Sequence, residues 1–238
     1  MTRALRVIDL GRRPYGDALE LQRELCRRRV AGAVDDDLLL LVEHDPVVTL
    51  GRGTRPESLP VPPDALRLRG VEVFEVERGG DVTVHEPGQL VGYPILDLQG
   101  HRPDLHWYLR ELEGVLIDAL ATVGIAAGRE PGRTGVWVEG RKVASIGIHV
   151  KQWVTFHGFA LNVTNDLRGF DAIVPCGIPG VEMTSVAREV ARIGGDPTAL
   201  RDRMQHAVVE ALGRRFDRTP VPDTLERTLG PALVSAAH

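Results

Sequence analysis

Cys176 is the side chain in this sequence best suited to nucleophilic chemistry. It lies in segment 174–180, VPCGIPG, where prolines stiffen the backbone and glycines allow another molecule to approach closely. A thiolate in a stiff, open loop is a good nucleophile when a nearby cation lowers the thiol pKa. The alternative is a small residue that fills a turn, and the local sequence does not decide between the two. Cys26, on the face of an expected helix, is more typical of a packing residue.

Three further segments could complete such a site. Lys142 begins an apolar strand, where it is either a solvated strand start or an ammonium that stabilises a thiolate and passes protons. Segment 78–89, RGGDVTVHEPGQ, is either an ordinary hairpin loop with polar side chains or a turn whose Gly-Gly amides face a ligand. In segment 157–163, HGFALNV, Gly158 and Ala160 leave one face of a strand free for an acyl chain, unless another strand packs there.

Several familiar catalytic motifs are incomplete. His85 and Glu86 are not followed by the second histidine of a zinc helix, and Pro87 would break that helix. Ser145 lacks the first glycine of a serine-hydrolase elbow, and the sequence contains no Walker A motif. The histidines and Cys176 show no metal-ligand spacing, so we expect neither a metal nor a cofactor.

The composition narrows the class of protein and of partner. The chain has 238 residues, is 43% hydrophobic and carries a formal charge of -4, which argues against a nucleic-acid partner. Two cysteines do not make a disulfide scaffold, and the first residues do not resemble a signal peptide. No apolar run approaches the ~20 residues that a membrane span needs. We therefore expect a cytoplasmic protein with no membrane or nucleic-acid partner.

Hydrophobic periodicity predicts the elements that position these residues. Residues 105–123 have leucines at helical spacing after Asp104, a good helix-capping residue. Helices are also expected at 15–30, 184–191 and 197–216, and strands at 37–43, 47–50, 71–76, 90–96, 135–138, 142–150 and 153–163. Helices mixed with consecutive hairpins indicate an α+β fold, with mixed, largely antiparallel sheets flanked by helices. We expect one catalytic domain over residues 1–216, followed by a weakly ordered C-terminal tail over 217–238.

Taken together, these segments resemble the lipoyl(octanoyl) transferase family. The combination of an Arg-Gly-Gly turn, an Arg-Lys-Val strand and a Pro-Cys-Gly loop is highly specific for this family, although each motif alone is weak evidence. In one departure, Glu86 stands where the family usually has glycine. The matching pieces occur in the family's order, at 43–46 (EHDP), 78–95 (RGGDVTVHEPGQLVGYPI), 135–150 (GVWVEGRKVASIGIHV), 157–163 (HGFALNV), 173–178 (IVPCGI) and 184–185 (TS).

The resemblance implies a biotin/lipoate ligase-like fold and the first step of endogenous protein lipoylation. The donor would be octanoyl-acyl carrier protein, and the acceptor a lysine on lipoyl domains of 2-oxoacid dehydrogenase complexes or on the glycine cleavage H protein. By position, Cys176 would carry the acyl thioester and Lys142 would activate it. Substrate contacts would map onto Arg78, Gly79, Gly80, Asp81, Val82, Thr83, Val84, His85, Ser145, Ile146, Gly147, Gly158, Phe159 and Ala160.

Two other functions fit the same residues. One is an ATP-dependent lipoate- or biotin-protein ligase on the same fold, which activates a free acid as an adenylate and needs no cysteine. The other is a non-catalytic protein that binds acyl chains or their carrier. Only the acyltransferase predicts a thioester on Cys176, so the three can be separated by experiment.

Overall fold

A computed structural model describes residues 3–178 and 180–230 of the chain, and only the backbone of Cys176. The strands are β1 (Arg3–Arg13), β2 (Asp37–His44), β3 (Val47–Leu50), β4 (Glu72–Glu75), β5 (Val82–His85), β6 (Gln89–Ile95), β7 (Gly128–Glu130), β8 (Arg133–Val138), β9 (Arg141–Lys151), β10 (Val154–Asn162) and β11 (Arg218–Pro222). The α-helices are α1 (Tyr15–Val30), α2 (Pro63–Arg67), α3 (Leu105–Ala121), α4 (Val186–Arg192), α5 (Leu200–Arg215) and α6 (Leu225–Leu229). None of the helices in these residues is long and apolar enough to cross a membrane.

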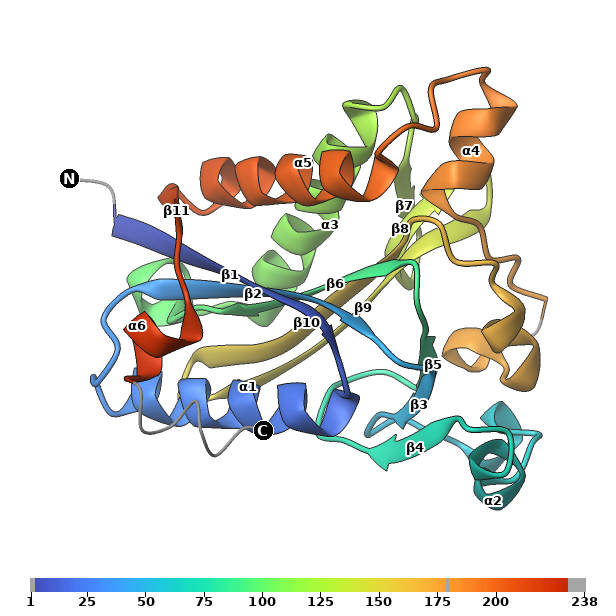
Figure 1. Cartoon of the computed structure of the whole chain (residues 1–238), viewed down its shortest axis with the longest axis horizontal. Helices are drawn as coiled ribbons and strands as arrows, with labels where there is room; N and C mark the ends of the chain where they lie inside the picture. The colour runs from blue at the N-terminus through green and yellow to red at the C-terminus, as the bar shows by residue number, and fades with distance from the viewer. Residues whose placement is uncertain (1–2, 179, 231–238) are drawn as a thin grey trace.

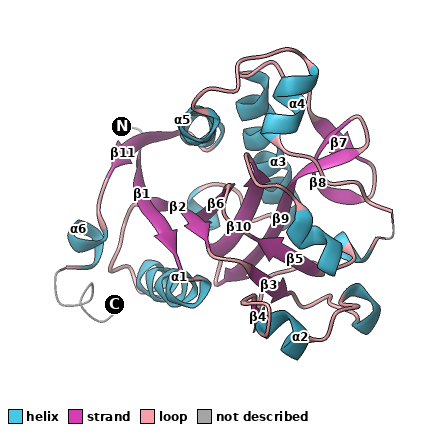
Figure 2. Ribbon diagram, turned by 45° about the vertical axis from the view of Figure 1, so that its right-hand side comes forward, coloured by secondary structure: helices cyan, strands magenta, loops and turns pink. Residues whose placement is uncertain are grey.

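The strands form one large and one small sheet. The large sheet has eight strands in the order β11-β1-β2-β6-β10-β9-β8-β7, and the small sheet has the order β4-β3-β5. Pairing is parallel among β11, β1 and β2 and antiparallel from β2 to β7. The small sheet lies beside α2 at one end of the molecule (Figures 1 and 2). The expected α+β class with mixed sheets is therefore confirmed.

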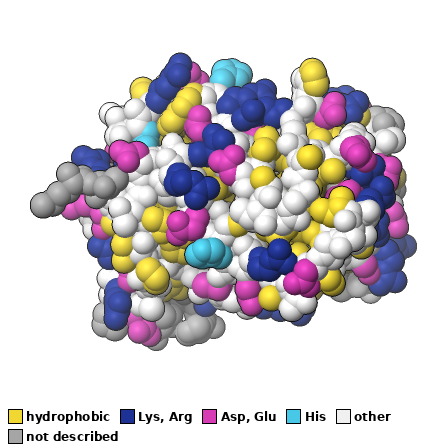
Figure 3. Space-filling model, turned by 90° about the horizontal axis from the view of Figure 1, so that it is seen from above, with side chains coloured by type: hydrophobic (Ala, Val, Ile, Leu, Met, Phe, Trp, Pro, Cys, Tyr) yellow, Lys and Arg dark blue, Asp and Glu magenta, His cyan; other side chains and the backbone are white. Residues whose placement is uncertain are grey.

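Helices cover both faces of the large sheet, with α3 and α5 on one side and α1 on the other (Figure 1). Leu39 and Leu41 of β2 pack toward α3 and α5, whereas Leu38 and Leu40 pack toward α1. Successive side chains of a strand point to opposite faces, and both faces are buried here. This explains the unbroken apolar run. On the outer surface of α3 and α5, side chains of both charges are interspersed (Figure 3).

Four strands were not expected from the sequence: β1, β5, β11 and the three-residue strand β7. β1 carries the charged residues Arg3, Arg6 and Asp9 around its buried Leu5 and Ile8, so its apolar pattern is weak. β5 lies inside the polar segment 78–89, where Val82 and Val84 are buried in alternation. β11 belongs to the expected tail, yet it pairs with β1 at the edge of the large sheet, where proline is tolerated. Residues 231–238 of that tail lie outside the described part of the chain.

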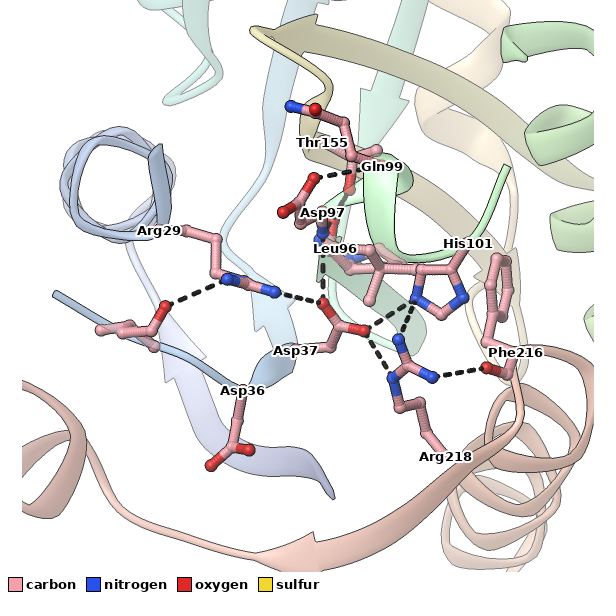
Figure 4. Close-up of polar contacts among 12 residues, drawn as sticks. Arg29, Asp36, Asp37, Leu96, Asp97, Gln99, His101, Thr155, Phe216 and Arg218 are labelled. Carbon is pink, nitrogen blue, oxygen red and sulfur yellow. Dashed lines mark hydrogen bonds and ion pairs between the residues drawn. The ribbon is translucent and has the colours of Figure 1, made fainter. Parts of the chain in front are cut away.

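The Asp37 carboxylate ties the C-terminal strand to the sheet (Figure 4). It accepts from Arg218 Nε at 2.7 Å, from the Asp97 amide at 3.1 Å and from Arg29 at 3.3 Å. His101 Nε2 lies 2.8 Å from the same carboxylate. Burial alone would raise the pKa of Asp37, but the His101 contact, the Asp97 amide and the Arg218 charge hold this pKa below its usual value.

Replacing Asp37 with asparagine is expected to lower the free energy of unfolding by about 3 kcal/mol, because two buried arginines lose their counter-charge. The control is Asp36→Asn, whose partly exposed pair with Arg6 contributes less than about 1 kcal/mol. Urea unfolding at neutral pH measures both losses. Because the pKa of Asp37 is lowered in the folded state, ionised Asp37 stabilises the fold at pH values above the ordinary carboxyl pKa. The difference in the free energy of unfolding between wild type and Asp37→Asn should therefore shrink as the pH falls below about 4. Equal losses in the two variants would refute this assignment.

Candidate active site

A cavity of ≈ 230 Å³ lies between strands β9 and β10 and segment 78–85. Most of the residues expected from the sequence to contact substrate line it: Arg78, Gly80, Asp81, Val82, Thr83, His85, Ser145, Ile146, Gly147, Gly158, Phe159 and Ala160, together with Lys142. Gly79 and Val84 are not among the lining residues. The Gly79 amide donates to the Ile148 carbonyl, and Val84 packs in the apolar cluster beneath β5.

Arg78 holds the polar turn in shape. Its guanidinium is largely buried and donates to the Thr49 carbonyl at 2.6 Å, the Asp81 carbonyl at 2.7 Å and the Gly79 carbonyl at 3.1 Å. A Cβ added to Gly147 would lie 2.9 Å from the Gly79 carbonyl oxygen. The turn therefore packs directly on β9, and only glycine at position 147 allows this approach.

Lys142 is buried in the cavity wall, so it is not a solvated strand start. Its side chain is 2% exposed, and its Nζ donates to the Thr134 carbonyl at 3.1 Å. Nζ also lies 5.2 Å from the ring centroid of Trp137, within range of a cation–π interaction. Its backbone donates to the Glu182 carbonyl and accepts from the Thr184 amide. The lysine is thus fixed at both its backbone and its ammonium.

The loop that carries Cys176 is held by backbone hydrogen bonds on both sides of this residue in the chain. Before it, the Val174 amide donates to the Ser58 carbonyl at 2.8 Å, and after it Glu182 pairs with Lys142. A Cβ at Gly177 would overlap the Asp81 carboxylate, and φ there is 63°. Ile178 lines the same cavity as Lys142. The backbone of the short helical turn Pro175–Gly177 therefore passes beside the segments that build the cavity, while the Cys176 side chain lies outside the described residues.

Small residues of two neighbouring strands lie side by side at the cavity. Gly158 of β10 is opposite Gly147 of β9, and Ala160 is opposite Ser145. A Cβ at Gly158 would overlap the Gly92 carbonyl of β6, so this glycine also permits close packing of a third strand. Gly158 therefore lines the cavity and also lets β6 approach closely.

A wall of aromatic rings completes the cavity, and His85 is the one member of it that was expected from the sequence to contact substrate. The wall is formed by Tyr15, His85, Tyr93 and His157. Behind it, His44 Nε2 lies 2.7 Å from the Tyr93 hydroxyl. Burial lowers the pKa of His44 and of His157 to about 4, and it lowers the pKa of His85 well below its ordinary value. At neutral pH these histidines are uncharged, which suits a wall facing an apolar group.

The residues of this wall come from four separate segments, so no local motif marks them. Tyr15 follows Pro14 at the start of α1, and Tyr93 lies in a completely buried strand. A polar aromatic within an apolar run is the one signal that could have pointed to Tyr93. The remaining lining residues missed from the sequence are Gly132, Arg133, Thr134, Trp137 and Ile178. Within residues 3–178 and 180–230, no group of three or more His, Cys, Asp or Glu side chains could hold a metal ion.

The sequence pattern of the lipoyl protein ligase A/B catalytic domain matches residues 14–213. The octanoyltransferase of Gloeobacter violaceus is 50% identical over 196 residues, which cover 78% of this chain and 86% of that protein. The octanoyltransferase of Geobacter metallireducens is 50% identical over 223 residues, covering 92% and 97% respectively. The chain belongs to the octanoyltransferase family. It is an acyltransferase, as the sequence predicts.

Solved structures similar to this octanoyltransferase family member support the fold. A bi-partite lipoate protein ligase from Thermoplasma acidophilum has a TM-score of 0.72 and 17% identity, covering 98% of this chain and 92% of that one. A biotin protein ligase from Leishmania major has a TM-score of 0.55 and 12% identity, covering 87% and 72%. The expected biotin/lipoate ligase-like fold is therefore confirmed.

Proposed function

We propose that this chain transfers an octanoyl group from the thioester of an acyl carrier protein to a lysine of lipoyl domains, through a thioester on Cys176. Membership of the octanoyltransferase family supports the acyl group and the reaction class. The observation that carries the proposal is a buried lysine, Lys142, in the wall of a cavity bordered by the loop that holds the chain's candidate nucleophile. The acceptors would be the lipoyl domains of 2-oxoacid dehydrogenase complexes and the glycine cleavage H protein.

In the first step, the Cys176 thiolate, which the Lys142 ammonium would stabilise, attacks the carbonyl carbon of the carrier thioester. A bond forms between Cys176 sulfur and the acyl carbon, and the bond between that carbon and the carrier sulfur breaks. The carrier thiolate leaves and takes a proton from the Lys142 ammonium. One thioester is exchanged for another of similar energy, so the step requires no ATP.

In the second step, the acceptor lysine attacks the acyl-enzyme as a neutral amine. The new bond joins the amine nitrogen to the acyl carbon, and the Cys176 thiolate leaves. Lys142, left neutral by the first step, accepts the proton that the amine loses, which restores both groups. An amide is more stable than a thioester, and this difference makes the transfer favourable.

The cavity suits an acyl chain in shape and charge. Gly147, Gly158 and Ala160 would form a low floor, because their side chains are absent or small. The uncharged aromatic wall would flank the chain on another side. Segment 78–83, fixed by Arg78, would lie over the acyl group close to its thioester. These residues are therefore the proposed substrate contacts.

Incubation with octanoyl-carrier protein, without ATP, tests the proposal. We expect the intact mass of the protein to rise by one octanoyl group, which is lost when an acceptor lipoyl domain is added. Peptide mapping should place the group on Cys176. The sequence has only two cysteines and two lysines, so each competing site can be checked. ATP-dependent transfer of free octanoate with no adduct would favour the ligase, and binding of octanoyl-carrier with neither adduct nor transfer would favour the non-catalytic carrier protein.

A further inference from the structure

Glu113 is a buried carboxylate on α3 that reaches the strand beside Lys142. Only 1% of its side chain is exposed. One oxygen, Oε2, accepts from Arg110 at 2.6 Å and from Arg129 at 2.8 Å. The other, Oε1, accepts from the backbone amide of Gly135 at 3.2 Å. The two arginines are about half-exposed, so Glu113 links the surface of α3 to the wall of the cavity.

Glu113 and Lys142 bind opposite ends of the same peptide group. The carbonyl of Thr134 accepts from Lys142 Nζ at 3.1 Å, and the amide of the following residue, Gly135, donates to Glu113. A peptide whose N–H donates to a carboxylate is fixed in orientation, and its carbonyl becomes a better acceptor. Glu113 therefore acts on the ammonium of Lys142 through one intervening peptide.

The packing at Gly135 makes this orientation matter. Gly135 has φ of 124°, in a region that favours glycine, and it lies directly under the Lys142 side chain. A Cβ at this position would lie 2.7 Å from Lys142 Cε and 2.6 Å from the Ala144 carbonyl oxygen. The lysine stem thus rests on the backbone that Glu113 holds. A rotation of this peptide would displace both the stem and the acceptor of the ammonium.

We propose that Glu113 is a positioning residue for Lys142, acting through the peptide between Thr134 and Gly135. The proposal rests on the proposed function, in which the Lys142 ammonium stabilises the Cys176 thiolate. Glu113 is not among the residues that line the cavity. It sets the direction of the Thr134 carbonyl and hence the place of the ammonium.

A purely structural role for Glu113 would depend on its ion pairs, which can be separated from the peptide contact. Glu113→Gln keeps an oxygen that can accept from Gly135, whereas Glu113→Met has a similar length and no such acceptor. Both variants lose the charge that pairs with Arg110 and Arg129. Arg129→Met is the matched control, because it removes an ion pair and leaves the Gly135 contact intact.

The readouts are the rate of acyl-enzyme formation and the pH profile of iodoacetamide alkylation at Cys176, followed by mass spectrometry of its peptide. Glu113→Met is expected to slow acyl-enzyme formation about tenfold and to move the alkylation profile to higher pH, as the loss of one hydrogen bond near a charged group would do. The KM for octanoyl-carrier protein should not change. Glu113→Gln should stay within about twofold of wild type, and Arg129→Met should match wild type.

Equal profiles for Glu113→Gln and Glu113→Met would overturn the proposal, as would a shift of the same size in Arg129→Met. If either single variant fails to fold, the comparison is repeated in the Arg129→Met background, which removes one of the arginines left unpaired. The measurement on the wild-type protein distinguishes a failure of this proposal from a failure of the proposed function on which it rests. If the wild-type protein forms no octanoyl adduct on Cys176, the proposed function fails; if it does, and the two Glu113 variants still agree, only the role of Glu113 fails.

Discussion

Replacing Cys176 with serine is expected to reduce octanoyl transfer by a factor of at least about 10³, because a hydroxyl is not ionised at neutral pH and is a far weaker nucleophile than a thiolate. The same variant should show no rise in intact mass after incubation with octanoyl-carrier protein. A single-turnover assay with a lipoyl domain as acceptor measures the rate, and mass spectrometry measures the adduct.

Cys26→Ser provides the control for this experiment. Cys26 lies on α1, is 2% exposed, and its Sγ lies 4.0 Å from the Val154 carbonyl oxygen. Burial raises the pKa of the Cys26 thiol, which makes a thiolate there still rarer at neutral pH. We expect Cys26→Ser to form the adduct at the wild-type rate. Full activity in Cys176→Ser, or an adduct that maps to Cys26, would exclude Cys176 as the nucleophile.

The long helices could be predicted from the sequence because their periodicity is local. Residues 15–30 form α1 with the expected bounds, and α3 begins after Asp104, whose side chain accepts from the Trp107 amide as a helix cap should. β11 could not be predicted in this way. Its partner β1 lies about two hundred residues earlier in the chain, and the segment RTPVP has little strand character until that pairing is known.

The burial of Lys142 could not be predicted from the sequence either. A lysine at the start of a strand is usually solvated. This one is buried by the Thr134 carbonyl and the Trp137 ring of the neighbouring strand β8, and by the backbone of residues 182–184, about forty residues later in the chain. Of the small residues of the cavity floor, Gly158 and Ala160 were expected from the pattern of their own strand, whereas Gly147 was expected only from the family resemblance. Of the aromatic wall, only His85 was expected, since the members of this wall meet only after α1, β5, β6 and β10 have packed together.

Glu86 shows how a departure from the family pattern can be judged once the turn is visible. A glutamate would be costly where only glycine tolerates the backbone angle, but Glu86 does not have a positive φ. Gly88 does, at 94°, and a Cβ there would lie 2.5 Å from the Asn165 amide nitrogen. Glu86 instead accepts from the Asn165 side chain at 2.8 Å. The turn therefore retains its glycine where the backbone requires one.

Replacing Lys142 with methionine is the second change from which we expect a large effect. Methionine keeps an unbranched apolar stem over Gly135 and Trp137 but removes the ammonium. Without it, the thiol of Cys176 should remain largely protonated at neutral pH, and the group proposed to give and take protons in the two transfer steps is lost. The rate of octanoyl transfer should fall by about 10²–10⁴, the usual contribution of a positioned acid or base.

Two measurements separate these roles of Lys142. The rate of Cys176 alkylation at neutral pH reports the thiolate alone, because alkylation needs no proton transfer from the lysine. Release of the octanoyl group from a preformed acyl-enzyme to a lipoyl domain reports the acceptance of the amine proton. Both rates should fall in Lys142→Met. Lys151→Met is the matched control, since Lys151 is the other lysine of the sequence and lies exposed at the end of β9.

Lys142→Arg sharpens the test, because an arginine keeps the positive charge but does not lose its proton near neutral pH. If Lys142 acts in both steps, this variant should retain more of the alkylation rate than Lys142→Met while remaining slow in transfer to the acceptor amine. Wild-type rates of both alkylation and transfer in Lys142→Met would remove Lys142 from the mechanism, and they would leave the buried ammonium as a packing feature of β9.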